Sequence, residues 1–127
     1  FWRILKMKFP SYNPDSTVAV SFGTHVYANG DLPLDYRVHE DVHLRRQGRS
    51  RLGAIRWWYQ YLRDANFRLH EEVLAFREQY RWVAKNPAFW YVRTPAQALE
   101  LFASQLASPL YGSMLSVSQA KKLIANG

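Results

Sequence analysis

The sequence predicts a single α+β domain in which a small antiparallel or mixed sheet precedes a packed helical region. The chain has 127 residues, which is the length of one ordinary domain. Hydrophobic residues make up 48% of it and aromatic residues 16%, which favours a folded core over disorder. Turn-forming residues and short β-favouring runs characterise residues 1–33, whereas helical patterns fill residues 34–127.

Two β-favouring segments are expected to supply the sheet. Residues 17–22 alternate in part between polar and apolar side chains, and residues 25–27 form a second short run. Asn29 and Gly30 then indicate a turn before the helical region begins.

The first helix is expected over residues 33–47. Asp31 is the predicted N-cap, and Gly48 suits the position after the C-terminus. Apolar residues at i, i+4 and i+8 predict its buried stripe, which consists of Leu34, Val38 and Val42.

Four further helical segments follow. The first covers residues 52–62 and the second residues 65–84, which Pro87 brings to an end. The expected buried face of residues 52–62 consists of Leu52, Ile55, Tyr59 and Leu62. Thr94 and Pro95 supply the cap and first position of the next helix, and Ser116 or Ser118 starts a last short one.

Composition excludes several classes of site. The chain has no cysteine, which rules out disulfides, thiolate-bound clusters and thiol catalysis, so a metal would need His, Asp or Glu. The net charge of +7 suits acidic partners, nucleic acid or anionic lipid, and also simple solubility. No transmembrane segment or signal peptide is visible, and together with the absence of cysteine this favours a cytoplasmic protein.

The first expected helix contains the motif H-E-x-x-H at residues 39–43. A spacing of four places the imidazoles of His39 and His43 on one face, one turn apart, where both can bind the same metal ion. Glu40 follows the first histidine and is placed to hold a water molecule on that metal.

A catalytic zinc ion needs a third protein ligand. Arg46 and Arg49 stand where an extended H-E-x-x-H-x-x-G-x-x-H motif would have glycine and histidine. A glutamate of the 65–84 helix is the alternative, and Glu71 and Glu72 are both available.

Helical spacing favours Glu72 over Glu71 as this ligand. Glu72 falls on an inward stripe together with Leu69, Phe76, Gln79 and Val83. A carboxylate in such a place is costly unless a metal or a cation pairs with it. Pairing with Arg68 or Arg77 is the competing interpretation.

The H-E-x-x-H motif with a downstream glutamate resembles the zincin metallopeptidases of the gluzincin type, in particular compact phage and bacterial forms. The resemblance covers about residues 17–84, and Glu72 begins a matching Glu-x-x-Ala segment. It implies Zn²⁺ bound by His39, His43 and Glu72, with Glu40 as the catalytic base. It also implies a peptide substrate that pairs with residues 17–22 or 25–27 as an edge strand.

One departure from this family concerns the support of the first histidine. Larger gluzincins have a Glu-x-x-x-Asp arrangement, but Phe76 occupies the aspartate position here. The replacement candidates are Asp35, Asp41 and Asp64. Tyr111 and His70 are candidate donors to the transition state.

The leading hypothesis is a zinc-dependent metallopeptidase that hydrolyses a peptide or similar amide bond. The alternative is a non-enzymatic zincin-like module that contacts a protein or nucleic acid. An arginine-rich bend at residues 45–51 precedes an aromatic run at residues 57–61, a combination that can bind single strands. Because no nucleic-acid-binding module is recognisable, a solvated helix end and a core cluster are favoured there.

Overall fold

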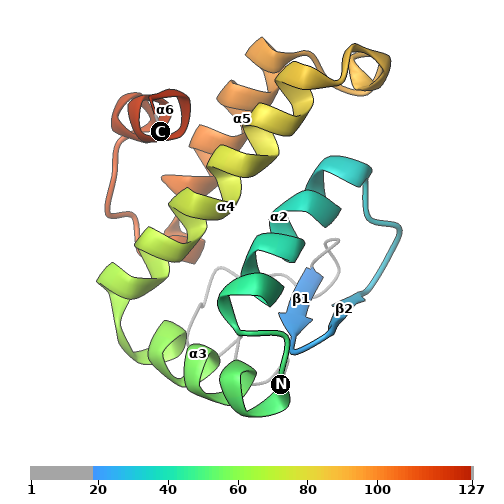
Figure 1. Cartoon of the computed structure of the whole chain (residues 1–127). Helices are drawn as coiled ribbons and strands as arrows, with labels where there is room; N and C mark the ends of the chain where they lie inside the picture. Colours follow the sequence, from blue (N-terminus) through green and yellow to red (C-terminus); the bar gives the residue numbers. More distant parts are fainter. Residues whose placement is uncertain (1–18, 127) are drawn as a thin grey trace.

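The computed structural model describes residues 19–126 and confirms the α+β class (Figure 1). Strands β1 (Ala19–Phe22) and β2 (His25–Ala28) form a two-stranded antiparallel sheet. Gly23 takes a φ of 66° in the two-residue turn between them, a conformation that costs glycine little. Positions 17 and 18 of the first expected strand lie outside the described residues.

All further regular elements of the described chain are helices. The α-helices are α2 (Leu34–Arg46), α3 (Arg51–Arg63), α4 (Ala65–Lys85), α5 (Pro95–Leu106) and α6 (Val117–Ala125), and the short 3-10 helices are η1 (Pro87–Phe89) and η2 (Pro109–Tyr111). The long helix α4 lies between α2 and the α5–α6 pair, and α3 crosses at one end (Figure 1). Helix α4 therefore packs against every other α-helix described.

Two helix starts agree with the sequence prediction, and one does not. Thr94 and Ser116 both form complete capping boxes, so Ser116 rather than Ser118 begins α6. The prediction that Asp31 caps the first helix is wrong. Helix α2 begins at Leu34 with Pro33 as its N-cap residue and no side-chain cap, which leaves Asp31 two positions too early.

The predicted buried face of α3 is also wrong. Leu52, Ile55 and Tyr59 are 57–62% exposed. The buried face instead carries Ala54, Trp57 and Tyr61. Burying the two large rings removes more apolar surface than burying the aliphatic stripe, and both rings carry a polar atom that finds a partner inside.

Helix α2 has an unexpected buried face as well. Leu34 of the predicted apolar stripe is 57% exposed, Val38 is half-buried and only Val42 is fully buried. The remaining buried positions of α2 are mostly polar. A helix that turns its polar side inward points to a site rather than to ordinary core packing.

The main hydrophobic core is built by α4, α5 and α6. Its fully buried side chains include Phe76, Val83, Phe102, Leu106 and Ile124. A smaller cluster joins β1 to α3 and contains Val20, Trp57 and Tyr61. The buried side chains that meet between α2 and α4 include the polar residues His39, Glu72 and Gln79.

Gln47 fastens the end of α2 to the hairpin. Its side-chain oxygen accepts from the Gly23 backbone N–H at 2.8 Å, and its amide nitrogen donates to the Ser21 carbonyl at 3.0 Å. The start of α3 passes so close to Gln47 that a Cβ atom at Gly53 would lie 1.8 Å from the Gln47 carbonyl oxygen. A glycine is therefore required at position 53.

We expect Gly53→Ala to destabilise the protein by about 1–3 kcal/mol, because backbone must move to admit the methyl group. Gly48→Asn is the matched control. Gly48 has open space around it and a φ of 75°, which asparagine tolerates. Urea unfolding should therefore show a lower midpoint for Gly53→Ala than for Gly48→Asn. Equal midpoints would contradict this packing.

Candidate metal centre

The inward face of α2 carries the ionisable groups of the site. Its buried residues are Asp35, His39, Glu40, Val42, His43 and Leu44. Four of these six side chains are ionisable, and burying such groups costs free energy unless each finds a partner. The residues that face α2 therefore determine which of these groups are charged and whether they can bind a ligand.

The two histidines of the motif converge on one point. Their Nε2 atoms lie 3.2 Å apart, and their rings meet edge to face one helical turn apart. Glu40 lies beside them, so that each of the three residues offers a ligand atom within 4.8 Å of the others. All three are buried, and the group can hold a metal ion.

Glu72 reaches the same point from α4. Its Oε2 lies 3.0 Å from His39 Nε2, and its Oε1 lies 3.2 Å from His43 Nε2. The hydroxyl of Tyr61 donates to Oε1 at 2.8 Å, which fixes the carboxylate from the side of α3. The structure thus brings the three predicted ligands together.

The described hydrogen bonds of the two competing arginines go to other groups than Glu72. Arg68 donates to the backbone carbonyls of Tyr61 and Leu62, and Arg77 donates to that of Leu123. The inward position of Glu72 is therefore satisfied by the two histidines and a tyrosine.

Glu71, the alternative ligand, faces a different way. It accepts from Trp57 Nε1 at 2.6 Å and from Arg46 Nε at 3.0 Å. The Trp57 ring lies 5.0 Å from the His43 ring. Glu71 thus holds Trp57 against the face of α2 that carries the two histidines.

Charge couples the groups of the centre strongly. Burial alone would raise the pKa of the Glu72 carboxyl, but His43 and His39 outweigh it and hold that pKa well below its usual range. Burial opposes protonation of His43, yet Glu72 and Glu40 raise its pKa to about 8. Burial raises the pKa of Glu40 against the charges of His43 and His39.

Gln79 supports His39 from behind, which the sequence interpretation missed. Its Oε1 lies 2.9 Å from His39 Nδ1, and it is completely buried. Gln79 follows Glu72 by two helical turns on the inward stripe, and this position could have identified it as a neighbour of the site. Phe76, which stands at the expected aspartate position, packs its ring 4.5 Å from the His39 ring.

The three aspartates proposed as support have different roles. Asp35 accepts from the Gln79 side chain at 3.0 Å and so reaches His39 only indirectly. Asp41 is half-exposed and pairs with Arg45 and Arg49. Asp64 caps α4. The predictions for Asp41 and Asp64 are therefore wrong, because neither side chain faces the site.

A cavity of about 590 Å³ opens onto the centre between α2, η2 and the end of α5. His39 and Glu40 line it together with Tyr36, Phe76 and Tyr111. Burial and the nearby charges of Glu72 and Glu40 raise the pKa of Tyr111 well above its usual value.

The second candidate donor, His70, lies away from the site. Its side chain is exposed on α4, and it does not line the cavity. It precedes Glu72 by two residues, which is about 200° around the helix. The prediction for His70 is therefore not supported by its position.

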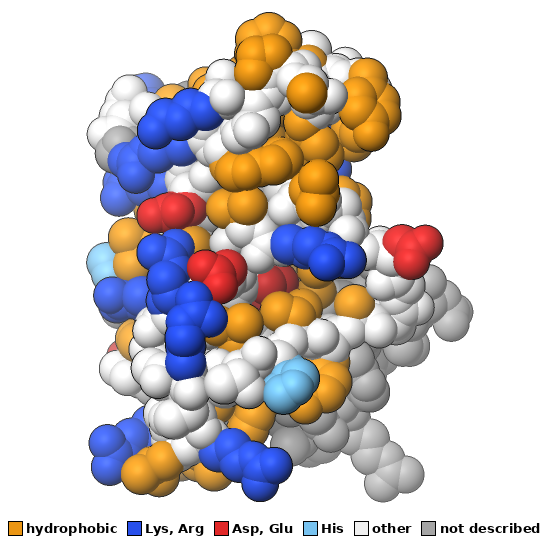
Figure 2. Space-filling view, turned by 45° about the vertical axis from the view of Figure 1, so that its right-hand side comes forward, with side chains coloured by type: hydrophobic (Ala, Val, Ile, Leu, Met, Phe, Trp, Pro, Cys, Tyr) orange, Lys and Arg blue, Asp and Glu red, His pale blue; other side chains and the backbone are white. Residues whose placement is uncertain are grey.

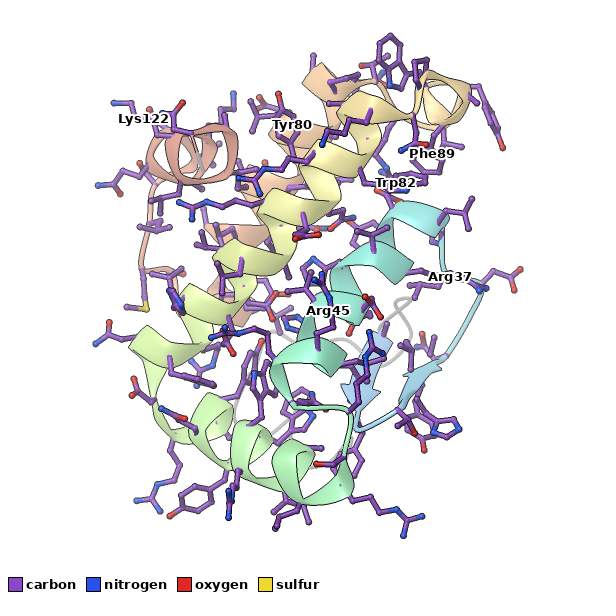
Figure 3. The ribbon with its side chains drawn as sticks, in the orientation of Figure 1. Arg37, Arg45, Tyr80, Trp82, Phe89 and Lys122 are labelled. Carbon is purple, nitrogen blue, oxygen red and sulfur yellow. The ribbon has the colours of Figure 1, made fainter. Side chains whose placement is uncertain are left out.

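The arginine-rich bend is largely neutralised. Arg45, which is labelled in Figure 3, pairs with Asp41 and Glu78, and Arg46 pairs with Glu71. On the face shown in Figure 2, basic side chains lie beside acidic ones. The following aromatic run contributes Trp57 and Tyr61 to the interior. These contacts favour structural roles for both segments.

Comparison of the chain with known protein families, curated proteins and solved structures found no match. Among the described helices, none is both long and apolar enough to cross a membrane. Functional assignment therefore depends on the chemistry of the centre itself.

We expect the metal-free protein to lose about 2 kcal/mol of stability as the pH rises from about 6.5 to about 8. The folded state holds the His43 proton more tightly than the unfolded state, so this contribution is complete below pH 6.5 and disappears above 8. Urea unfolding with a chelator present measures it. His43→Asn should remove the slope, whereas the control His25→Asn should keep it. A flat profile for the parent protein would contradict the Glu72–His43 coupling.

Proposed function

We propose that this protein is a zinc-dependent hydrolase of peptide or similar amide bonds, with a centre of the gluzincin type. One observation carries the proposal. Two imidazole nitrogens from α2 and a carboxylate from α4 meet within 3.0–3.2 Å of one another in a buried position beside a cavity. His39, His43 and Glu72 would hold the ion.

The donor set fits zinc. Two ligand atoms bound to one tetrahedral zinc lie about 3.3 Å apart, because each is about 2.0–2.1 Å from the ion. The Nε2 atoms of His39 and His43 are 3.2 Å apart. Two histidines and one carboxylate form a frequent ligand set of catalytic zinc, which leaves a position for water or substrate. Glu72 suits the third position better than Glu40, because its oxygens approach both nitrogens.

Glu40 suits the role of general base. A bound zinc ion would lower the pKa of a water molecule and polarise the substrate carbonyl. The Glu40 carboxylate then takes the proton of the attacking water and delivers it to the leaving amine. Burial raises its pKa, and a general base works best when its pKa approaches the working pH.

The cavity suits a substrate. Tyr111 lines it, and its raised pKa keeps the hydroxyl protonated and able to donate to the developing oxyanion. Ala19, the first residue of β1, also lines the cavity. The Ser21 carbonyl already accepts from Gln47 and Trp58. A substrate backbone would therefore pair with the Ala19 end of β1.

The parent protein should bind one zinc ion per chain. Loss of a residue that only supports a ligand typically weakens metal binding by about 10–100-fold. Glu72→Gln removes a ligand itself and should therefore weaken zinc binding by more than about 100-fold. Competition with a chromophoric chelator measures the affinity. Glu78→Gln is the matched control, because Glu78 is a half-exposed glutamate of the same helix that pairs only with Arg45 among the described contacts. The absence of zinc uptake by the parent protein would refute the proposal.

Glu40→Gln should retain zinc but lose about 10²–10⁴-fold in the rate of peptide cleavage, because the general base is gone. Mass spectrometry of a mixed peptide library incubated with the zinc-loaded protein measures the rate. Glu78→Gln again serves as the control and should cleave at the parent rate. A parent protein that binds zinc and cleaves nothing would instead favour a non-enzymatic module.

A further inference from the structure

His39 can bind a metal through Nε2 only in one tautomer. The neutral ring carries one proton, and Nε2 is free when that proton is on Nδ1. Nδ1 faces Gln79 Oε1 at 2.9 Å, and an oxygen acceptor there holds the ring proton on Nδ1. Nε2 faces Glu72 Oε2 at 3.0 Å, and a proton held between these two atoms would leave when a metal binds. The orientation of the Gln79 amide therefore decides whether His39 offers a ligand.

A glutamine amide alone cannot make this choice. Its oxygen and nitrogen have almost the same shape, and a rotation by 180° exchanges an acceptor for a donor. With the nitrogen facing His39, the ring would need its lone pair on Nδ1 and its proton on Nε2. That arrangement would block the position that ligates.

Asp35 removes the ambiguity. Its Oδ2 lies 3.0 Å from Gln79 Nε2, and an ionised carboxylate accepts hydrogen bonds but donates none. Only one orientation of Gln79 satisfies Asp35, and in that orientation Oε1 faces His39. Both Asp35 and Gln79 are completely buried, so no solvent competes for these contacts.

The negative charge of Asp35 has its own partner. Arg93 Nε lies 2.8 Å from Asp35 Oδ2, and the Arg93 side chain is largely buried, with its guanidinium group over the rings of Tyr36 and Phe89. A buried carboxylate without a cation would be strongly unfavourable. Arg93, which lies in the connection from η1 to α5, therefore stabilises the ionised form of Asp35.

We infer that Asp35 is a positioning residue for the proposed zinc site. Asp35 fixes the orientation of the Gln79 amide, and this orientation fixes the His39 tautomer in which Nε2 is free to bind the metal. The inference rests on the proposed function. It assigns the orienting carboxylate to the same helix as the metal ligand, one turn before it, with an amide from α4 between them.

The test is zinc affinity, measured by chelator competition on the full chain. The amide introduced by Asp35→Asn offers Gln79 both a donor and an acceptor, so that either orientation of Gln79 is satisfied. We expect this variant to bind zinc about 10–100-fold more weakly. Asp41→Asn makes the same change at a half-exposed position of the same helix and should leave the affinity unchanged. Unchanged affinity in Asp35→Asn would overturn the inference.

The exchange Asp35→Asn with Gln79→Glu separates positioning from general stability. It conserves the net charge and places the acceptor-only group directly against His39 Nδ1. We expect affinity within a few-fold of the parent, whereas a merely structural role for Asp35 predicts no such rescue. Failure of rescue in a double variant that melts cooperatively would overturn the inference.

A measurement on the unaltered protein covers variants that do not fold. A long-range ¹H–¹⁵N spectrum of the zinc-loaded chain should place the remaining ring proton of His39 on Nδ1. A proton on Nε2 would overturn the inference, although zinc binding would still support the proposed function. A parent chain that takes up no zinc would overturn both.

Discussion

The contact between Glu72 and the two histidines of α2 is the interaction on which the rest of this structure depends. It joins α2 to α4 through polar atoms rather than through apolar packing, and it lies between the two hydrophobic clusters. Burying one carboxylate and two imidazoles is unfavourable unless each supports the charge of the others. The surrounding elements therefore serve to hold these three groups at bonding distance.

Helix α3 and the hairpin both constrain that contact. Helix α3 supplies Tyr61, which donates to Glu72, and Trp57, which packs on His43. Helix α3 can approach because Gly53 has no side chain to collide with the end of α2. The hairpin is fixed to the same end of α2 through Gln47. The packing of α3 and the hairpin against α2 thus also determines the geometry of the centre.

Much of this arrangement is visible in the sequence, and the parts that are not have a common cause. The H-E-x-x-H spacing, the inward stripe of Glu72 and the caps at Thr94 and Ser116 depend on local periodicity, which a sequence displays directly. The buried face of α3 depends on what the opposite helices offer to its rings. The contact of Tyr61 with Glu72 also joins separate helices, and no local pattern encodes it. The inward stripe of α4 marks Gln79 as buried, but it does not show that His39 is its partner.

Phe76, which stands where the gluzincin pattern resembled by the sequence has an aspartate, is surrounded by side chains that form a connected set. With an aromatic ring against His39, the support for that histidine must come from the next inward position of α4, which is Gln79. The Gln79 amide in turn donates to the Asp35 carboxylate, one contact farther from the centre. That carboxylate is buried and requires Arg93. Phe76 is thus accompanied, behind His39, by a connected set of three side chains, which are Gln79, Asp35 and Arg93.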